Sequence, residues 1–529
     1  MKIQTIKKRY FAAAFILIGL IFSFSRLPTA EMQNAPANNQ SKDNIQPFPV
    51  KRIETPDTWQ RDGEAFVERG KNKKNFGRRA KNVILFVGDG MGITTLTASR
   101  ILEGQMRGES GEENQLSFEE FPSVALSKTY SVNQQTSDSA PTMSAIISGI
   151  KTDEGIISVN QNVIVGDYRT VKGNETKTLL EMAEERGLST GVVSTARLTH
   201  ATPAACYAHT AHRDWEADAN LTAEARQNDF PDIARQLIEF PYGDGLEVAL
   251  GGGRTKFISN QTSDPEYGDR KGERLDGRDM PAEWMKKYQN SGYVWNKQQF
   301  DRIDPKRTKH LLGLFEPSQM KYEYDRPKDQ AGEPSLSEMT TKAIDIVSNN
   351  KKGYFLMVEA GRIDHAHHDG NAFRALIDTI ELSNAVRAAL KKVNLNETLI
   401  IVTADHSHTF TMAGYPARGN NILGLIREVG NGGLLEETTK NDSNRQPFTT
   451  LGYANGKGYV GGTRPSLTQE VVTNPDYRQE AAVPLNSETH GGEDVAVFAT
   501  GAGSDLIHGV MEENWIFYAM KEALRLKNN

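Results

Sequence analysis

Short apolar runs alternate with amphipathic helical patterns along most of this chain, and this alternation restricts the fold more than any other feature. Fully buried strands are predicted for six runs, at residues 83–87, 190–194, 246–250, 354–358, 399–403 and 495–499. Helices are predicted at residues 176–186, 335–348, 372–392 and 509–526. Such an alternation predicts an α/β fold, with a mainly parallel central β-sheet sandwiched between helices. Ligands of these sheets bind beyond the carboxyl ends of the strands.

Two stretches interrupt the alternation. Residues 409–484, approximately, are rich in Gly, Asn, Tyr and Arg and show little periodicity, so we expect an inserted subdomain between two strands. Residues 251–328 are dense in charge, Gly and Pro and predict a surface elaboration. The chain has 529 residues, 37% of them hydrophobic, which is enough for a large core around the sheet.

The N-terminus has the pattern of a signal peptide. Three lysines and an arginine within the first nine residues precede an apolar run at 10–24, and small and polar residues follow it. The run has about 15 residues, fewer than the ~20 that span a bilayer, so we expect residues 1–30 to direct export to the periplasm or the medium, without a stable membrane span. An uncleaved N-terminal anchor is the alternative, because Pro28 stands where a small residue is preferred. Residues 31–75 are interpreted as a linker and N-terminal segment, and 76–529 as the main domain.

Charge and cysteine content exclude several classes of function. The net charge is −6, so nothing in the overall charge favours nucleic-acid binding. Cys206 is the only cysteine, which rules out an intrachain disulfide and zinc or iron–sulfur sites built from several thiolates. Any metal site must therefore use histidine and carboxylate ligands.

Candidate ligands of this kind gather next to the predicted strands. Four local motifs supply Asp89, Glu359, Asp364, His368, Asp405, His406 and His490. Asp364 and His368 are four residues apart, so a helix would place them on one face. Mixed imidazole and carboxylate ligands favour zinc, whereas an oxygen-only subset favours magnesium. The pattern therefore predicts more than one divalent ion.

A serine and an arginine could complete a catalytic site. Asp138 and Ser139 introduce a helical run, so Ser139 is expected at a helix N-terminus, where main-chain N–H groups favour a phosphoryl group. The alternative is that Ser139 is only the N-cap of that helix. Thr202 offers a further oxygen ligand, and the guanidinium of Arg213 could bind two phosphate oxygens.

Seven motifs of this chain resemble those of the alkaline phosphatases and occur in that family's order. They lie at residues 88–92, 138–140, 200–203, 212–215, 361–368, 403–406 and 489–494. The resemblance spans about residues 81–510 and is strongest to the branch that includes the animal enzymes. It implies an α/β catalytic domain at 76–529 with a crown-like insertion at about 409–484, which in relatives meets its counterpart in a homodimer.

The resemblance also implies an activity and a set of site residues. The chain would hydrolyse phosphate monoesters through a phosphoserine intermediate, with Ser139 as nucleophile and Arg213 holding the phosphate. The implied cofactors are two Zn²⁺ and one Mg²⁺ per chain. One zinc would be bound by Asp364, His368 and His490, the other by Asp89, Asp405 and His406, and the magnesium by Thr202, Glu359 and the shared Asp89.

The chain departs from parts of the family pattern. His200 and His365 stand where other branches carry an Asp and a Lys, so both are expected beside the metal ligands rather than among them. Phe315, Glu316 and Glu333 match parts of a calcium site of the animal enzymes, but Asn228 falls where a carboxylate is expected, which argues against calcium here.

Two sister activities on the same fold remain as alternatives, phosphodiester cleavage and sulfate ester hydrolysis. Against the second, Met143 occupies the position at which sulfatases have an arginine.

Overall fold

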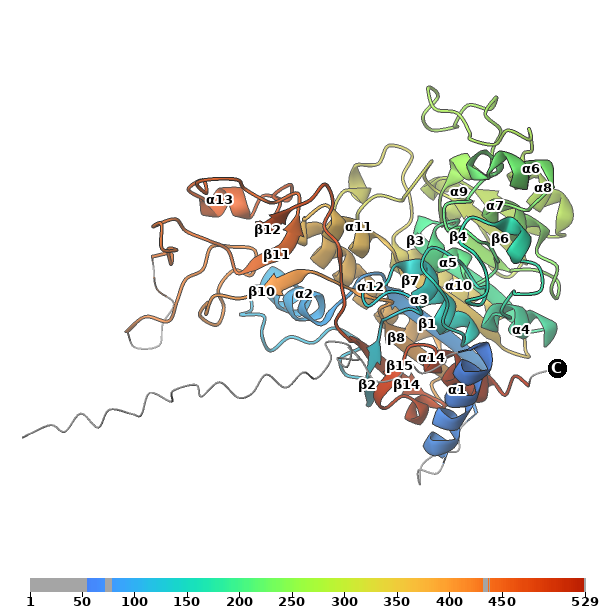
Figure 1. Ribbon diagram of the computed structural model, residues 1–529, viewed down its shortest axis with the longest axis horizontal. Helices are drawn as coiled ribbons and strands as arrows, with labels where there is room; N and C mark the ends of the chain where they lie inside the picture. The colour runs from blue at the N-terminus through green and yellow to red at the C-terminus, as the bar shows by residue number, and fades with distance from the viewer. Residues whose placement is uncertain (1–54, 72–78, 432–435, 437, 528–529) are drawn as a thin grey trace, which may run out of the picture. The chain divides into compact units, whose positions relative to one another are not determined.

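A ten-stranded sheet forms the centre of the protein in the computed structural model, which describes residues 55–71, 79–431, 436 and 438–527 (Figure 1). The strand order is β15-β2-β14-β8-β1-β7-β3-β4-β6-β5. The strands are β1 Asn82–Gly88, β2 Ser123–Lys128, β3 Ser189–Arg197, β4 Val248–Gly252, β5 Ser291–Val294, β6 His310–Leu314, β7 Tyr354–Ala360, β8 Thr398–Thr403, β14 Val495–Gly501 and β15 Gly509–Glu512. The predicted signal peptide and most of the predicted linker lie outside the described residues.

Seven adjacent strands, from β8 to β5, run parallel, whereas β14 is antiparallel to both of its neighbours, β8 and β2. The mainly parallel sheet is therefore confirmed. The reversal of β14 matters for the site, because it brings the start of β14 to the edge at which the parallel strands end.

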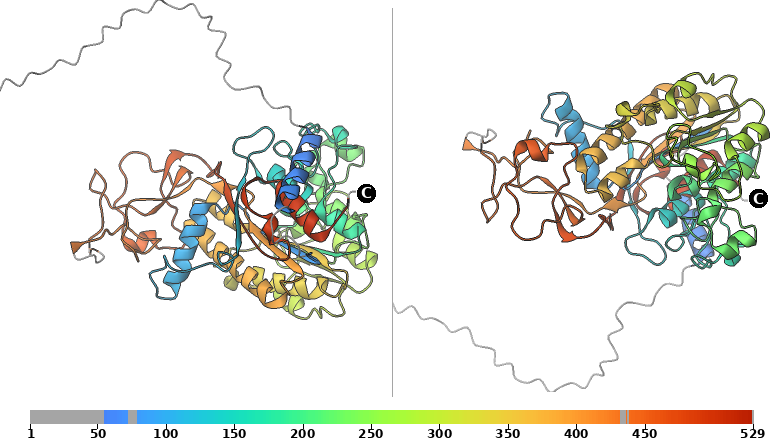
Figure 2. Two further views of the ribbon diagram at one scale, coloured as in Figure 1. Left: turned by 90° about the horizontal axis from the view of Figure 1, so that it is seen from below. Right: turned by 90° about the horizontal axis from the view of Figure 1, so that it is seen from above.

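Helices cover both faces of the sheet. Alternate residues of β1 point to opposite faces: Val83, Leu85 and Val87 belong to one buried cluster, and Ile84 and Phe86 to another. The first face carries α1 (Pro56–Lys71), α3 (Ser139–Ser148), α4 (Leu179–Glu185), α5 (Ala201–Ala204), α7 (Ile233–Glu239), α8 (Met280–Lys287) and α14 (Trp515–Leu524). The second carries α10 (Leu336–Val347) and α12 (Ala372–Lys392). Figure 2 shows α10 and α12 on one side of the sheet and α1 with α14 on the other.

One predicted helix begins later than expected. The segment predicted at 509–526 starts as the edge strand β15, and α14 covers only Trp515–Leu524. In β15, Val510 is exposed and the next residue, Met511, is buried, which is the alternation of a strand with one face on the core. Pairing with β2 decides the conformation, and a single-chain pattern does not reveal that partner.

The stretch between β8 and β14 builds a second, smaller sheet. Its strands are β10 (Phe410–Met412), β11 (Leu451–Gly456) and β12 (Ala481–Pro484), and the short helix α13 (Gln469–Val472) lies between the last two. Phe410, Leu451 and Tyr453 pack on α2 (Ile93–Met106) and α12. This small sheet lies to one side of the large sheet in Figure 1 and occupies the predicted insertion. Among the described residues, no helix is both long and apolar enough to cross a membrane.

Candidate active site

Strand register brings the predicted carboxylates together. Val87, near the end of β1, pairs with Glu359 of β7 on one side and with Thr403 of β8 on the other. Asp89 and Asp405 each lie two residues beyond these paired positions, at the carboxyl ends of β1 and β8. Three acidic side chains from adjacent strands therefore converge at one edge of the sheet.

Asp89, Asp405 and His406 form what we call the inner cluster. His406 Nε2 lies 3.5 Å from Asp89 Oδ1 and 3.4 Å from Asp405 Oδ2, and all three side chains are fully buried. Burial, followed by the charge of Asp405, raises the pKa of Asp89 well above its usual range. Burial also lowers the pKa of His406, which keeps the ring neutral and able to offer a lone pair. Carboxylates next to a neutral imidazole are a zinc-binding combination.

Several buried polar atoms at this edge have no hydrogen-bond partner among the described residues. They are both carboxylate oxygens of Asp89, Asp405 Oδ2, Glu359 Oε1, Thr202 Oγ1 and His200 Nδ1. Unpartnered buried oxygens are costly, and clustering them would be costlier still without a cation. Divalent ions would supply the missing partners, so the residues present fit the metals that the sequence predicts.

A second group, the outer cluster, comprises Asp364, His368, His408 and His490. Asp364 and His368 both lie on α11 (Arg362–His368), so their spacing of four places them on one face, with Asp364 Oδ1 3.2 Å from His368 Nε2. Asp364 Oδ1 is also 2.9 Å from His408 Nε2 and 3.4 Å from His490 Nε2. Burial opposes ionisation of Asp364, but the imidazoles outweigh it and hold the pKa of that carboxyl well below its usual range.

The path of the chain explains how His490 reaches this group. It pairs with His408 in a two-stranded ladder, β13 (His490–Gly491) with β9 (Ser407–His408), just before the chain enters the antiparallel β14. The side chains of His368 and His490 are 31% and 14% exposed, in contrast to the fully buried inner cluster. Two members of the outer cluster are therefore open to solvent, whereas Asp364 and His408 are buried.

A third group surrounds Glu359. Asp89, His200 and Glu359 each offer an atom within 4.8 Å of the others, and Thr202 lies in the adjacent first turn of α5. Ser194 Oγ donates a short hydrogen bond to Glu359 Oε2, which leaves Oε1 without a hydrogen bond. Burial raises the pKa of Glu359 to about 7. The added hydroxyl and carboxylate oxygens suit magnesium.

Ser139 is the first residue of α3 and lies against the inner cluster. Its Oγ is 3.1 Å from His406 Nε2, and the residue is 2% exposed. The alternative interpretation of Ser139 as an N-cap is wrong: Asp138 is the N-cap, and its Oδ1 accepts a hydrogen bond of 2.8 Å from Ala140 N. The Ser139 hydroxyl is thus not used for capping.

Arg213 lies beside the serine. Its Nη1 donates to Asp138 Oδ1 at 2.9 Å, and its Nη2 is 3.3 Å from His200 Nε2. Burial opposes the charge of Arg213, but Asp138 and other carboxylates raise its pKa further, so the guanidinium is permanently positive. Asp138, the residue before Ser139, thus anchors this charge at the start of α3.

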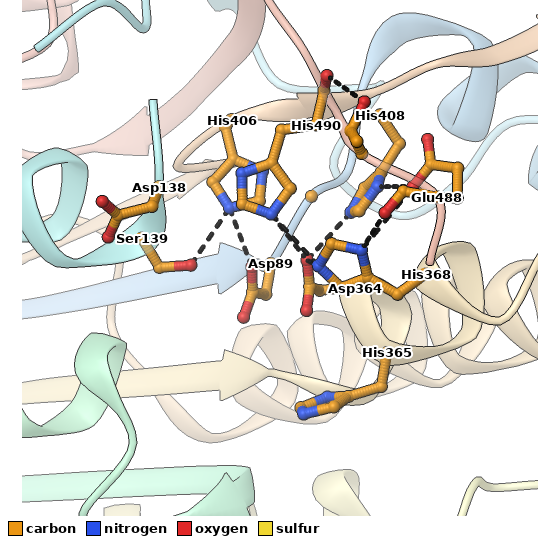
Figure 3. A network of polar contacts seen from close by, with 12 residues as sticks. Asp89, Asp138, Ser139, Asp364, His365, His368, His406, His408, Glu488 and His490 are labelled. Carbon is orange, nitrogen blue, oxygen red and sulfur yellow. Dashed lines mark hydrogen bonds and ion pairs between the residues drawn. The ribbon is translucent and has the colours of Figure 1, made fainter. Parts of the chain in front are cut away.

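The two histidines predicted outside the metal ligands have different surroundings. His200 belongs to the group around Glu359, whereas His365 Nδ1 lies 2.7 Å from the carbonyl oxygen of Gly361. Their rings are 5.5 Å apart. Burial lowers the pKa of both, that of His365 to about 4, so both rings are neutral. Figure 3 places His365 apart from the other labelled histidines.

Sequence reasoning missed His408 and Glu488 as site residues. His408 Nδ1 is 2.6 Å from Glu488 Oε2, and both side chains are fully buried. Burial opposes protonation of His408, but the charge of Glu488 raises its pKa to about 9. The local signal for His408 is its position two residues after His406 at the end of a strand. Glu488 has no local signal, because its partner lies 80 residues away.

Two residues that match parts of the calcium site of the animal enzymes form an ion pair and a hydrogen bond with Lys321. Lys321 Nζ lies 3.0 Å from Glu316 Oε1, and Lys321 N donates to Glu333 Oε1 at 2.7 Å. Asn228 is exposed at the end of α6 (Ala223–Gln227), where it bonds to its own helix. The expectation that calcium does not bind here stays a prediction.

Comparisons with known proteins agree on one family. A model of the family described as "Alkaline phosphatase" matches residues 80–526. The chain is 43% identical over 482 residues to the tissue-nonspecific alkaline phosphatase of Gallus gallus. The alignment covers 89% of this chain and 90% of that protein. The chain is 44% identical over 459 residues to an alkaline phosphatase of Gadus morhua, with 85% and 93% covered.

Solved structures of low sequence identity share the fold. An alkaline phosphatase from Thermus thermophilus aligns with a TM-score of 0.61 at 24% identity, covering 87% of this chain and 94% of that one. One from the Antarctic bacterium TAB5 aligns with a TM-score of 0.57 at 22% identity, covering 85% and 99%.

Proposed function

Because this chain belongs to the alkaline phosphatase family and hydrolyses phosphate monoesters, we propose that Ser139 is its nucleophile and that two zinc ions and one magnesium ion serve the reaction. The observation that carries the proposal is the 3.1 Å contact between Ser139 Oγ and His406 Nε2, next to buried carboxylate oxygens that lack partners. A hydroxyl in that position would lie at the edge of a zinc site.

The proposed ligands follow the two clusters. Asp89, Asp405 and His406 would hold one zinc, and Asp364, His368 and His490 the other. Thr202 and Glu359 would hold magnesium, with Asp89 shared. The bound ions would lower the pKa of the serine hydroxyl and stabilise negative charge on the attacked phosphoryl group and its leaving oxygen.

The residues of the chain would act in two displacements. In the first, Ser139 Oγ loses its proton and forms a bond to phosphorus, while the bond from phosphorus to the ester oxygen breaks and the alcohol leaves with a proton. In the second, water forms the new bond to phosphorus, the bond to Ser139 Oγ breaks, and the serine regains its proton. The products are an alcohol and inorganic phosphate, with retention at phosphorus.

Arg213 would hold the phosphoryl group through both steps. Its position is fixed by Asp138, whose carboxylate also caps α3. The cap therefore links the nucleophile and the guanidinium: Asp138 bonds to the second residue of α3 while Ser139 is the first. Two guanidinium N–H groups match two oxygens of a phosphoryl group and would keep phosphorus in line with Ser139 Oγ.

Trapping the intermediate tests the nucleophile directly. After acid quenching during turnover of an aryl phosphate, mass spectrometry should find one added phosphoryl group on the peptide that contains Ser139. A phosphoryl group on another residue, or none under conditions in which the quench preserves phosphoserine, would contradict the proposal.

Substrate rates test the reaction class. An aryl phosphate monoester should be hydrolysed with a higher kcat/KM than a bis-aryl phosphate diester or an aryl sulfate, because Arg213 is placed to bind two unesterified oxygens. A higher kcat/KM on either of the other two substrates would contradict this.

Export and assembly are proposed on sequence grounds. Residues 1–30 would direct the chain out of the cytoplasm, to the periplasm or the medium, and the insertion at 409–484 would contact its counterpart in a homodimer. Analytical ultracentrifugation tests the homodimer by comparing the wild type with Tyr415→Asp. Tyr415 is an exposed residue of the insertion. A monomeric wild type would overturn the proposed homodimer.

A further inference from the structure

The histidine rings of the outer cluster share one feature, which is that each Nδ1 faces an oxygen. His368 Nδ1 lies 2.6 Å from the carbonyl oxygen of Glu488, and His490 Nδ1 lies 2.7 Å from the carbonyl oxygen of Ser137. A carbonyl oxygen only accepts, so both rings must carry a proton on Nδ1 and leave the Nε2 lone pair exposed. The two Nε2 atoms are 3.2 Å apart, next to Asp364.

His408 differs from these two rings because carboxylates lie on both sides of it. Its Nδ1 is 2.6 Å from Glu488 Oε2, and its Nε2 is 2.9 Å from Asp364 Oδ1. Both ring nitrogens of His408 are therefore in contact with carboxylate oxygens. His408 thus links Glu488 to Asp364, whose Oδ1 it holds.

Glu488 is itself fixed at the other end of this chain of hydrogen bonds. Its Oε1 accepts 2.7 Å bonds from both the N–H and the hydroxyl of Thr409. The residue is 1% exposed, so water does not compete for these bonds. Glu488 thus bonds to His408 with its side chain and to His368 with its main chain, as Figure 3 shows from close by.

We propose that Glu488 is a positioning residue of the outer cluster, which orients Asp364 through His408 and so sets how tightly this cluster binds zinc. The inference rests on the proposed function, in which Asp364, His368 and His490 hold one zinc. Groups that orient metal ligands from behind change metal affinity about 10- to 100-fold when they are removed.

Zinc affinities of matched variants test the proposal. Competition with a chromogenic chelator should give two zinc dissociation constants for the wild type, for Glu488→Ala and for Glu488→Gln. In Glu488→Ala the weaker-binding site should lose about 10- to 100-fold in affinity, with a smaller loss in Glu488→Gln, whose amide oxygen still accepts one hydrogen bond. The other constant should not change, and excess zinc should restore kcat.

Glu493→Gln is the matched control. Glu493 lies five residues along the same segment, and its Oε1 accepts from Ser407 Oγ at 2.7 Å instead of from a histidine. Its zinc constants should equal those of the wild type. A loss equal to that of Glu488→Gln would mean that any change in this segment disturbs the site, and would overturn the assignment to Glu488.

A double-mutant cycle separates positioning from general stability. In a His408→Gln background, Glu488→Gln should cause no further loss of zinc affinity, because Glu488 acts through His408. Fully additive losses would contradict the proposal. Thermal unfolding in excess chelator should give similar Tm values for Glu488→Gln and the wild type, since the effect lies in the ion site rather than in the fold.

Failure of this inference is distinguishable from failure of the proposed function. Wild-type zinc constants in both Glu488 variants would overturn the positioning role and leave the hydrolase unaffected. A wild type that binds zinc tightly but does not turn over phosphate monoesters would overturn the proposed function, while the zinc constants would still decide the role of Glu488.

Discussion

Buried glutamates lie beside both ends of strand β3, yet among the described residues only those at one end belong to a group that could hold a metal ion. At the amino end, Thr190 Oγ1 donates to Glu184, and Ser189 Oγ and Thr190 N donate to the two oxygens of Glu247. Further along the strand, Ser194 donates to Glu359.

Burial raises the pKa of all three carboxyls, to about 9 for Glu184, 8 for Glu247 and 7 for Glu359. Burial is therefore not what distinguishes the two ends. At the carboxyl end, acidic groups from three adjacent strands converge with neutral imidazoles, and the groups that could share an ion among the described residues include Glu359 but neither Glu184 nor Glu247. The amino-end glutamates can hold protons, whereas the carboxyl-end oxygens point at one shared space.

The largest predicted effect concerns the nucleophile at the carboxyl end. Ser139→Ala should lower kcat on an aryl phosphate by at least about 10³-fold, because the variant loses the hydroxyl that would form the bond to phosphorus. Zinc content by elemental analysis should stay at the wild-type value, since Ser139 is not among the proposed ligands. Near-wild-type kcat would show that the inner cluster serves a different nucleophile.

Neutralising one glutamate at each end gives the sharpest contrast. Glu359→Gln should reduce kcat at low magnesium by at least about 10-fold, because an oxygen ligand is weakened. Glu247→Gln should leave kcat unchanged under the same conditions. Steady-state rates across a magnesium titration make the comparison, and equal effects of the two substitutions would remove the distinction between the ends.

The two clusters within the site should differ in how fast they lose metal. His368 and His490 are partly exposed, whereas the inner cluster is fully buried. A chelator should therefore remove one zinc per chain in a first phase and the second in a slower phase, and His490→Asn should accelerate the first phase alone. Simultaneous loss of both ions would show that exposure does not govern release.

The smallest predicted effect is on stability at the amino end. A carboxyl whose pKa is higher in the folded than in the unfolded state stabilises the fold at acidic pH, and this contribution is lost as pH rises through the folded pKa. For Glu184 the loss extends from about pH 4.5 to pH 9. Glu184→Gln should therefore be more stable than the wild type at pH 9 to 10, by at least about 1.4 kcal/mol, the equivalent of one pKa unit.

Denaturant unfolding of the metal-loaded protein at pH 5 and pH 9.5 measures this difference. The control is Glu185→Gln, one residue further along α4, where the side chain is 30% exposed beside Lys177. The control should gain nothing at alkaline pH. A Glu184→Gln variant that is less stable than the wild type at pH 9.5 would mean that burial does not disfavour the ionised carboxylate of Glu184, and would contradict its raised pKa.

The central strands, and the gathering of most residues proposed as ligands, were predictable because they depend on local pattern. β1, β7 and β8 are buried on both faces, so their sequences are continuous apolar runs, and the residues that follow them must lie at the carboxyl edge. The spacing of Asp364 and His368 indicated that a helix would place both on one face, and α11 does so. Features that depend on one segment alone could therefore be predicted from the sequence.

Features that depend on distant partners were not predictable in this way. β2 and β15 lie at the edge of the sheet and are short and partly exposed, so their patterns are weak. The reversed direction of β14 follows from pairing with β8 and β2, which no local motif reports. The bond between His408 and Glu488 likewise joins segments 80 residues apart.

The direction of β14 has a consequence for how the protein is made. The strand enters the sheet from the edge that carries the site, and the segment just before it delivers His490, which follows β1, β7 and β8 in chain order. The core strands β1 and β8 also pair across more than 300 residues, as in the bond between Asn82 and Thr398. Long-range pairing of this kind folds slowly. A growing chain that has emerged only as far as β8 therefore carries an incomplete ion site, because His490 has not yet been made.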